Sequence, residues 1–173
     1  NKIKLQEKPL SKEGVYEMYS IYVDRDDDIW LYSPSGLWIY NVLGKKWKKE
    51  LAAKAQGAKN DMVQSVYHAR NGLVWVGRDQ HGICMMDKET GESTILTRIE
   101  NDERSLQNNS VLSLYEDANG VMWVGTYKKG VSYYSESIFK FGINHIGDVN
   151  CVEEDDDNHM WIGTNDEGLY RLN

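Results

Sequence analysis

One pattern occurs four times along the chain: a tryptophan followed by a glycine six or seven residues later. The tryptophans, spaced 45, 48 and 38 residues apart, are Trp30, Trp75, Trp123 and Trp161. The glycines that follow them are Gly36, Gly82, Gly130 and Gly168. A repeat of this length is typical of architectures in which one supersecondary unit is copied and stacked. The chain is therefore expected to fold as four copies of one unit.

Each copy contains strand-like runs separated by turn residues. The first run precedes the tryptophan (residues 19–23, 63–67, 111–115 and 149–152), and the second contains it (29–32, 74–77, 122–126 and 160–164). The third begins near the glycine (37–40, 83–86, 131–134 and 169–172), and a more variable fourth fits 46–51, 93–99 and 137–143. Asn71-Gly72 and Asn119-Gly120 between the first two runs predict hairpins, with the positive backbone angles of a type I′ turn.

Four antiparallel strands repeated at this period predict an all-β fold, a β-propeller of about four blades. We expect blades at residues 16–59, 60–107, 108–146 and 147–173, with residues 1–10 as an outer strand of a preceding or the closing blade. Only residues 51–58 are compatible with a helix. A part of a longer propeller is favoured over a closed ring of four blades.

Composition and charge narrow the function classes. The 173 residues carry a net charge of −7 and no block of basic residues, which argues against a nucleic-acid partner. No apolar run approaches the roughly 18 residues of a membrane helix. Cys84 and Cys151 lie far apart with no CxxC pair, so neither a zinc site nor a disulfide scaffold is expected. No cofactor is predicted.

The third repeat carries a specific motif. It contains Glu116-Asp117, Gly120 and Trp123-Val-Gly-Thr126, and then Gly130-Val131. The fourth repeat keeps Glu154-Asp155, Trp161-Ile-Gly-Thr164 and Gly168. In the second repeat Arg78 stands where threonine is usual, and in the first Leu31 and Tyr32 replace the Val-Gly pair. The pattern resembles the two-component regulator propeller repeat over residues 16–173.

That resemblance implies a place in a larger protein, as part of a larger seven-bladed propeller. Members of the family are large extracytoplasmic sensors of hybrid two-component systems in Bacteroides-like bacteria, and many sense oligosaccharides released from glycans. It implies a periplasmic sensor segment that binds such an oligosaccharide or relays its binding, in contact with the remainder of the sensor protein and compatible with a homodimer. No kinase, membrane or signal-peptide segment is recognised in these residues, so the signalling output is expected elsewhere.

Several motifs have both a functional and a structural interpretation. The repeated tryptophans Trp75, Trp123 and Trp161 could stack on sugars, but their fixed place favours wedging adjacent sheets, with Gly77, Gly125 and Gly163 allowing close approach. The acidic runs 24–28 and 153–157 are similar to calcium loops but lie where the repeat places solvated turns. The four histidines have no metal or catalytic spacing, so no metal site and no catalytic residue is predicted.

The predicted ligand site lies on the loops between the second and third strands. These loops vary from blade to blade while the strands repeat, which suits recognition on a rigid scaffold. Arg78, His81, Lys128 and Lys129 could pair with acidic groups, and Tyr127 could pack on a sugar face. The full set of candidate residues is Arg78, Asp79, Gln80, His81, Tyr127, Lys128, Lys129, Asn165, Asp166 and Glu167.

Two other classes stay open beside the non-enzymatic sensor. One is a propeller enzyme acting on carbohydrate, a glycoside hydrolase or lyase, because any two of the 27 acidic residues could converge in the fold. A quinone-dependent dehydrogenase belongs to the same alternative. The other is a protein-interaction scaffold without a small ligand. The motif order of the third repeat favours the sensor over both.

Overall fold

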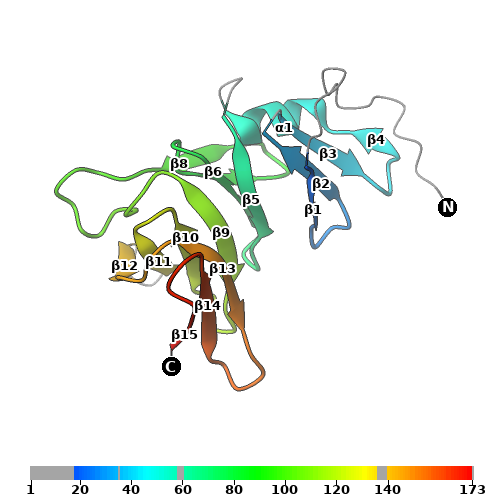
Figure 1. Ribbon diagram of the computed structural model, residues 1–173. Coiled ribbons are helices and arrows are strands. Elements are labelled where there is room, and N and C mark those ends of the chain that lie inside the picture. The colour runs from blue at the N-terminus through cyan, green and yellow to red at the C-terminus, as the bar shows by residue number, and fades with distance from the viewer. Residues whose placement is uncertain (1–17, 35, 58–60, 136–139, 173) are drawn as a thin grey trace.

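The structure is a computed structural model that describes residues 18–34, 36–57, 61–135 and 140–172. The strand predicted at residues 1–10 lies outside this part. Four antiparallel sheets follow one another in chain order (Figure 1), and each is a meander in which neighbours in sequence are neighbours in the sheet. The propeller architecture predicted from the repeat is confirmed. Within the described residues no helix is both long and apolar enough to cross a membrane.

The strands fall into the four sheets as the repeat predicts. Sheet one holds β1 (Ser20–Val23), β2 (Ile29–Ser33), β3 (Gly36–Asn41) and β4 (Lys46–Trp47). Sheet two holds β5 (Val63–His68), β6 (Leu73–Arg78), β7 (Ile83–Asp87) and β8 (Ser93–Leu96). Sheet three holds β9 (Val111–Glu116), β10 (Met122–Thr126), β11 (Gly130–Ser135) and β12 (Lys140–Asn144). Sheet four holds β13 (Val149–Glu154), β14 (Met160–Thr164) and β15 (Leu169–Leu172).

The strand predicted at residues 46–51 is too long, because the helix α1 begins within it and spans Lys49–Gln56. Strand β4 ends at Trp47, and the helix packs against β3 through the buried residues Ala52 and Ala55. Tyr32 occupies the position of the glycine in the other sheets, and its larger side chain joins this cluster. Sheet one therefore meets sheet two through a helix as well as through strands.

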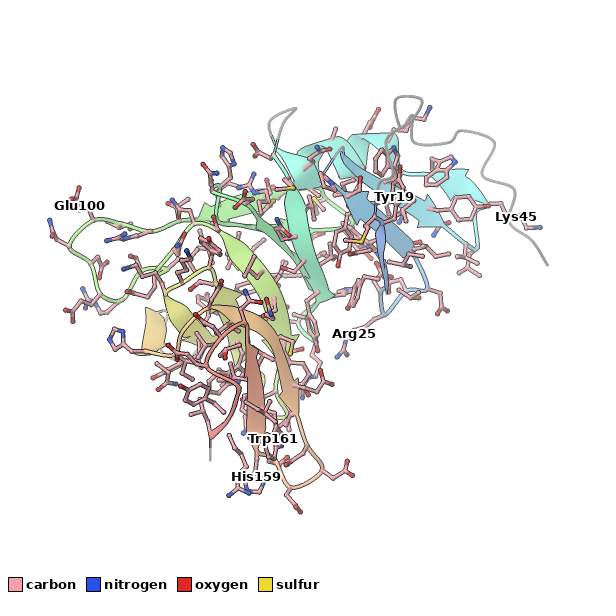
Figure 2. All side chains as sticks on the ribbon, viewed as in Figure 1. Tyr19, Arg25, Lys45, Glu100, His159 and Trp161 are labelled. Carbon is pink, nitrogen blue, oxygen red and sulfur yellow. The ribbon has the colours of Figure 1, made fainter. Side chains whose placement is uncertain are left out.

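Trp75 and Trp123 pack against the next sheet, as predicted, and Trp30 does the same. Trp30 lies in a cluster with residues of sheet two, and Trp75 in a cluster with residues of sheet three. Trp123 packs against the buried residues of sheet four. Trp161, in the last described sheet, is partly exposed (Figure 2). One tryptophan from each of the first three sheets therefore packs that sheet against the next.

The glycines two residues after these tryptophans allow close approach. A Cβ added at Gly77 would lie 2.7 Å from Val111 Cγ1, and one at Gly125 would lie 2.7 Å from Val149 Cγ1. Both valines belong to the first strand of the following sheet. The strands β5, β9 and β13 consequently lie next to one another toward the middle of the arc of sheets (Figure 1).

The Asn-Gly hairpins form, but the predicted turn type is wrong. Only the glycines have positive φ, 87° at Gly72 and 80° at Gly120, whereas a type I′ turn would need the preceding asparagines to have it too. The connections are residues 69–72 in sheet two and 117–121 in sheet three, and the Asp117 side chain organises the second of them. Its Oδ1 accepts hydrogen bonds from the amides of Asn119 and Val121. A carboxylate therefore replaces the need for two left-handed residues.

Candidate functional site

The loops between second and third strands share one face with the segments that lead into each sheet. The amides of Asp79, Tyr127 and Asn165 each donate to a carbonyl of the lead-in segment of their own sheet. The amides of Gly82 and Gly130 donate to the lead-in of the following sheet. We call this surface the loop face, and define it by residues 78–82, 127–129 and 165–167 with the lead-in residues 61–62, 108–110 and 147–148. All ten candidate residues lie on it.

Arg78 is turned inward rather than toward a ligand. Its guanidinium lies 3.0 Å from Asp61 Oδ2, and both side chains are about 5% exposed. The same guanidinium donates to the His81 carbonyl at 2.7 Å, while His81 Nδ1 lies 3.3 Å from Asp61 Oδ1. Arg78 thus stabilises its own loop, and a ligand acid would have to compete with Asp61 for it. Its assignment to the ligand site stays a prediction.

Asp79 and Gln80 tie sheet two to sheet three. The Ser110 hydroxyl donates to Asp79 Oδ1 at 2.6 Å, and the Gln80 amide donates to the same hydroxyl at 3.1 Å. Gln80 has a φ of 60°, and its side chain is exposed. The Asp79 carboxylate and the Gln80 amide therefore already form hydrogen bonds within the protein, whereas the Gln80 side chain points to solvent.

The loop of sheet three offers the most accessible recognition groups. Tyr127 is 43% exposed, and Lys128 Nζ lies 5.0 Å from the centre of its ring. A side-chain hydrogen bond with Tyr127 raises the pKa of Lys128. Lys129 is also exposed. An aromatic face beside two ammonium groups can pack on a sugar ring and pair with an acidic substituent.

Asp148 joins the loops of sheets three and four. Its Oδ1 accepts from the Lys128 amide at 3.3 Å, and its Oδ2 accepts from Asn165 Nδ2 at 2.9 Å. Glu167 accepts from the Gly147 amide at 3.2 Å, whereas Asp166 is exposed to solvent. The structure therefore brings the Lys128 amide and the Asn165 side chain together around one carboxylate, with the Tyr127 ring beside Lys128, and keeps Arg78 apart in a buried ion pair.

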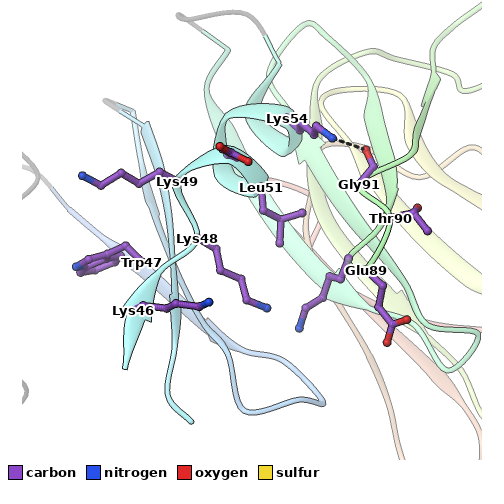
Figure 3. Close-up of a pocket in the computed structure, with 11 residues that line it drawn as sticks. Lys46, Trp47, Lys48, Lys49, Leu51, Lys54, Glu89, Thr90 and Gly91 are labelled. Atoms are coloured by element: carbon purple, nitrogen blue, oxygen red, sulfur yellow. Dashed lines mark hydrogen bonds between the residues drawn. The ribbon is translucent and has the colours of Figure 1, made fainter. Parts of the chain in front are cut away.

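A concave region that the sequence did not predict lies between sheet one and sheet two. It is a pocket of about 470 Å³ between the β4–α1 segment and the β7–β8 turn (Figure 3). Its lysines are Lys46, Lys48, Lys49, Lys54 and Lys88. Lys54 donates to the Gly91 carbonyl across the pocket, and Lys48 points into it (Figure 3). Nothing in the repeat distinguishes these lysines from surface residues.

The acidic run 24–28 lies behind this pocket and is only partly the solvated turn expected from the sequence, because residues 25–27 are exposed but the two ends of the run are not. Asp24 and Asp28 are buried, and Lys88 Nζ lies 2.5 Å from Asp24, 2.7 Å from Asp26 and 2.9 Å from Asp28. Burial alone would lower the pKa of Lys88, but the three carboxylates outweigh it and raise the pKa above its usual range. Lys48 adds a contact to Asp28 at 2.8 Å.

Lys88 also occupies the place where the neighbouring acidic residues could hold a metal ion. Asp24, Asp26 and His68 place their ligand atoms within 4.8 Å of one another. The ammonium of Lys88 already supplies the positive charge that these carboxylates need. Desolvation would raise the pKa of Asp28, yet hydrogen bonds from Lys48, Asn41 and Lys88 lower it. This cluster is therefore a buried ion-pair network between sheets one and two.

The repeat motif matches the profile of a known protein family in two places. Residues 105–128 and 145–166 match the profile of the two-component regulator propeller. These two segments are repeats of that family. A comparison with curated proteins found no match.

Solved structures share the propeller fold. The extracellular domain of BT4673 from B. thetaiotaomicron, described as a hybrid two-component system, matches with a TM-score of 0.65 and 20% identity over 88% of this chain. That of BT3049 from the same organism matches with a TM-score of 0.62 and 19% identity over 91% of the chain. The chain spans only 22% and 28% of these two structures. The computationally designed Ika4 protein matches with a TM-score of 0.63 and 14% identity, with 94% of each chain covered.

Proposed function

We propose that this chain is a propeller segment of an extracytoplasmic sensor of the hybrid two-component type, and that its loop face binds a glycan-derived oligosaccharide or relays its binding. The observation that carries this is the regulator-propeller profile, matched by two repeats in tandem. The chain acts by binding and performs no reaction itself. A kinase and its membrane anchor belong to other parts of the protein.

The loop face supports recognition by its chemistry. Tyr127 presents an accessible ring, Lys128 a charge beside it, and Asn165 an amide within the same patch. The backbone beneath is fixed by strand pairing and by the bonds of each loop to its lead-in segment. Rigid strands that present adaptable polar groups are the usual basis of specific binding in loops.

Transmission requires that the ligand prefer one arrangement of the sensor over another. Asp148 connects the loops of sheets three and four, so a ligand that bonds to the Lys128 or Asn165 side of this patch changes how tightly the two sheets are held together. The ligand would then favour one relative placement of neighbouring blades, which the rest of the sensor reads.

Titration calorimetry against a panel of neutral and acidic oligosaccharides tests the proposal. Tyr127→Ala and Lys128→Ala are expected to weaken the binding of a responding oligosaccharide by about tenfold each, which is the loss of one good contact. Lys45→Ala is the matched control, because Lys45 is exposed at the β3–β4 turn, on the end of sheet one opposite to the loop face (Figure 2). Absence of binding across the panel, or equal loss in all three variants, would count against it.

A further inference from the structure

The turn between the first two strands of sheet two lacks a carboxylate that the other three sheets have. In those sheets an aspartate six residues before the tryptophan accepts the indole N–H, at 2.7 Å from Asp24 Oδ2 to Trp30, 2.9 Å from Asp117 Oδ2 to Trp123 and 2.7 Å from Asp155 Oδ2 to Trp161. The same position in sheet two is Ala69. Its amide donates to the Leu73 carbonyl, as the Asp117 amide donates to that of Val121.

The indole of Trp75 consequently has no acceptor. Trp75 is 2% exposed, and its Nε1 is buried without a hydrogen-bond partner in the described part of the chain. A buried donor left in this state costs about 1–3 kcal/mol. Asn71 Oδ1 accepts a hydrogen bond from the Leu73 amide at 3.1 Å. Asn71 therefore takes over the backbone hydrogen bond that the aspartate makes in sheet three, but not the hydrogen bond to the indole.

A pocket lies where the carboxylate is missing. Ala69 and Trp75 both line a space of about 420 Å³ whose opposite wall, in sheet three, includes Met122 and Tyr134. The Tyr134 ring meets the Trp75 ring edge-on, with 5.2 Å between centres. Pockets of about 300–1,000 Å³ that combine apolar and polar groups are typical of small-molecule sites, and the polar residues of this lining are Arg70, Asn71, Glu116, Asn119 and Ser135. Among the described residues that line it, Trp75 is the one with a buried side-chain polar atom that has no hydrogen-bond partner.

Charged groups at the pocket are compatible with an anion. Arg70 lines it with 42% of its side chain exposed, and Glu116 Oε2 accepts from the Arg70 amide at 2.9 Å and lies 3.4 Å from its Nε. Two carboxylates already coexist in the equivalent place of sheet three. There the carboxylate of Asp117 caps the turn while Glu154 accepts from the Ala118 amide at 3.0 Å. A second carboxylate beside Glu116 would reproduce that arrangement.

We propose that this pocket binds a small organic carboxylate, one oxygen of which accepts the Trp75 indole N–H in place of the missing aspartate side chain. The volume left beyond the carboxylate accommodates a body of about monosaccharide size. Arg70, whose Nε lies beside Glu116 and whose Nη1 donates to the Ala118 carbonyl, pairs with the second oxygen through its remaining N–H groups. The proposal rests on the Trp75 site alone and does not depend on what the loop face binds.

Indole N–H resonances in ¹⁵N–¹H spectra of the chain test it, with acetate and glucuronate as probes. The Trp75 resonance is expected to shift saturably with both, and not with glucose or with chloride at equal ionic strength. The Trp123 resonance is an internal control, because Asp117 already holds its N–H. Ala69→Asp fills the site and is expected to weaken binding at least about tenfold, and Arg70→Gln, at an exposed side chain, several-fold.

Three results would overturn the proposal. The Trp75 resonance could fail to move with either carboxylate, or it could move equally with glucose, which would make the site a hydroxyl or water site. It could also respond as strongly in Ala69→Asp and Arg70→Gln as in the unchanged chain. Arg70→Gln keeps the test decisive if Ala69→Asp alters folding.

Discussion

Restoring the missing carboxylate should stabilise the chain. In Ala69→Asp the new side chain can accept the Trp75 indole N–H, which is buried and unpaired in the described structure. A hydrogen bond to a charged group contributes about 1.5–3 kcal/mol. Part of this is lost to desolvation, because the equivalent Asp117 is only 7% exposed. We expect a net gain of about 1 kcal/mol, and for a domain of this size a melting temperature raised by about 2–4 °C.

The gain should depend on pH in a defined direction. At the equivalent position of sheet four, the hydrogen bond from the Trp161 indole, followed by the amide of His159, lowers the pKa of Asp155 to about 2. A carboxylate with a lowered folded-state pKa stabilises fully above its unfolded pKa, about 3.9, and loses this effect as the pH falls through the folded value. The difference between Ala69→Asp and the unchanged chain should thus be constant from about pH 5 to 7 and shrink below about pH 4.

Urea denaturation of both chains at pH 7 and pH 3 measures the effect, and Asp117→Ala provides the reverse change. It removes the acceptor of the Trp123 indole and of two turn amides, so a loss of about 2–3 kcal/mol is expected. An unchanged or lower stability of Ala69→Asp, together with the expected loss in Asp117→Ala, would refute the reasoning, because the indole of Trp75 would then not be an unmet donor.

Three further predictions concern the contacts between sheets. Lys88→Met leaves buried carboxylates without their ammonium and should cost about 3–5 kcal/mol in urea denaturation, against less than about 0.5 kcal/mol for the exposed Lys129→Met. The loss of unfolding free energy in Lys88→Met should shrink as the pH falls through the lowered pKa values of Asp26 and Asp28. Urea denaturation of Lys88→Met and of the unchanged chain at a series of acidic pH values measures this. Gly125→Ala, whose Cβ would lie 2.7 Å from a side-chain carbon of the next sheet, should lose about 1–3 kcal/mol; a stability equal to that of the unchanged chain would contradict the close packing.

The parts of the fold that repeat could be predicted from the sequence. A tryptophan with a glycine two residues later recurs in three sheets, and recurrence at a fixed position indicates a structural role. The helix α1 was harder, because Lys46-Trp47 does form a strand and the change to a helix depends on Ala52 and Ala55 packing against sheet one. That packing is a tertiary contact that no local pattern specifies.

The ion-pair network could not be predicted for a similar reason. Lys88 follows Asp24 by 64 residues, and nothing local marks it as the partner of an acidic turn. The Trp75 site differs, since its signal was present in the sequence. Aligning the four turns places Ala69 where Asp24, Asp117 and Asp155 stand, and a missing acceptor beside a retained tryptophan is readable from that alignment.

Sheet two departs from the repeat at three positions, and each departure changes a bonding group rather than the backbone path. Ala69 replaces the turn aspartate, His68 stands where Glu116 stands in sheet three, and Arg78 replaces the threonine. The strand pairing and the turn bonds of sheet two nevertheless match those of sheet three. A change that keeps the strand pairing and the turn bonds but removes or reverses a charge alters what the surface can bind without changing the backbone. By this argument the two pockets that flank sheet two gain chemistry that the repeat does not itself provide.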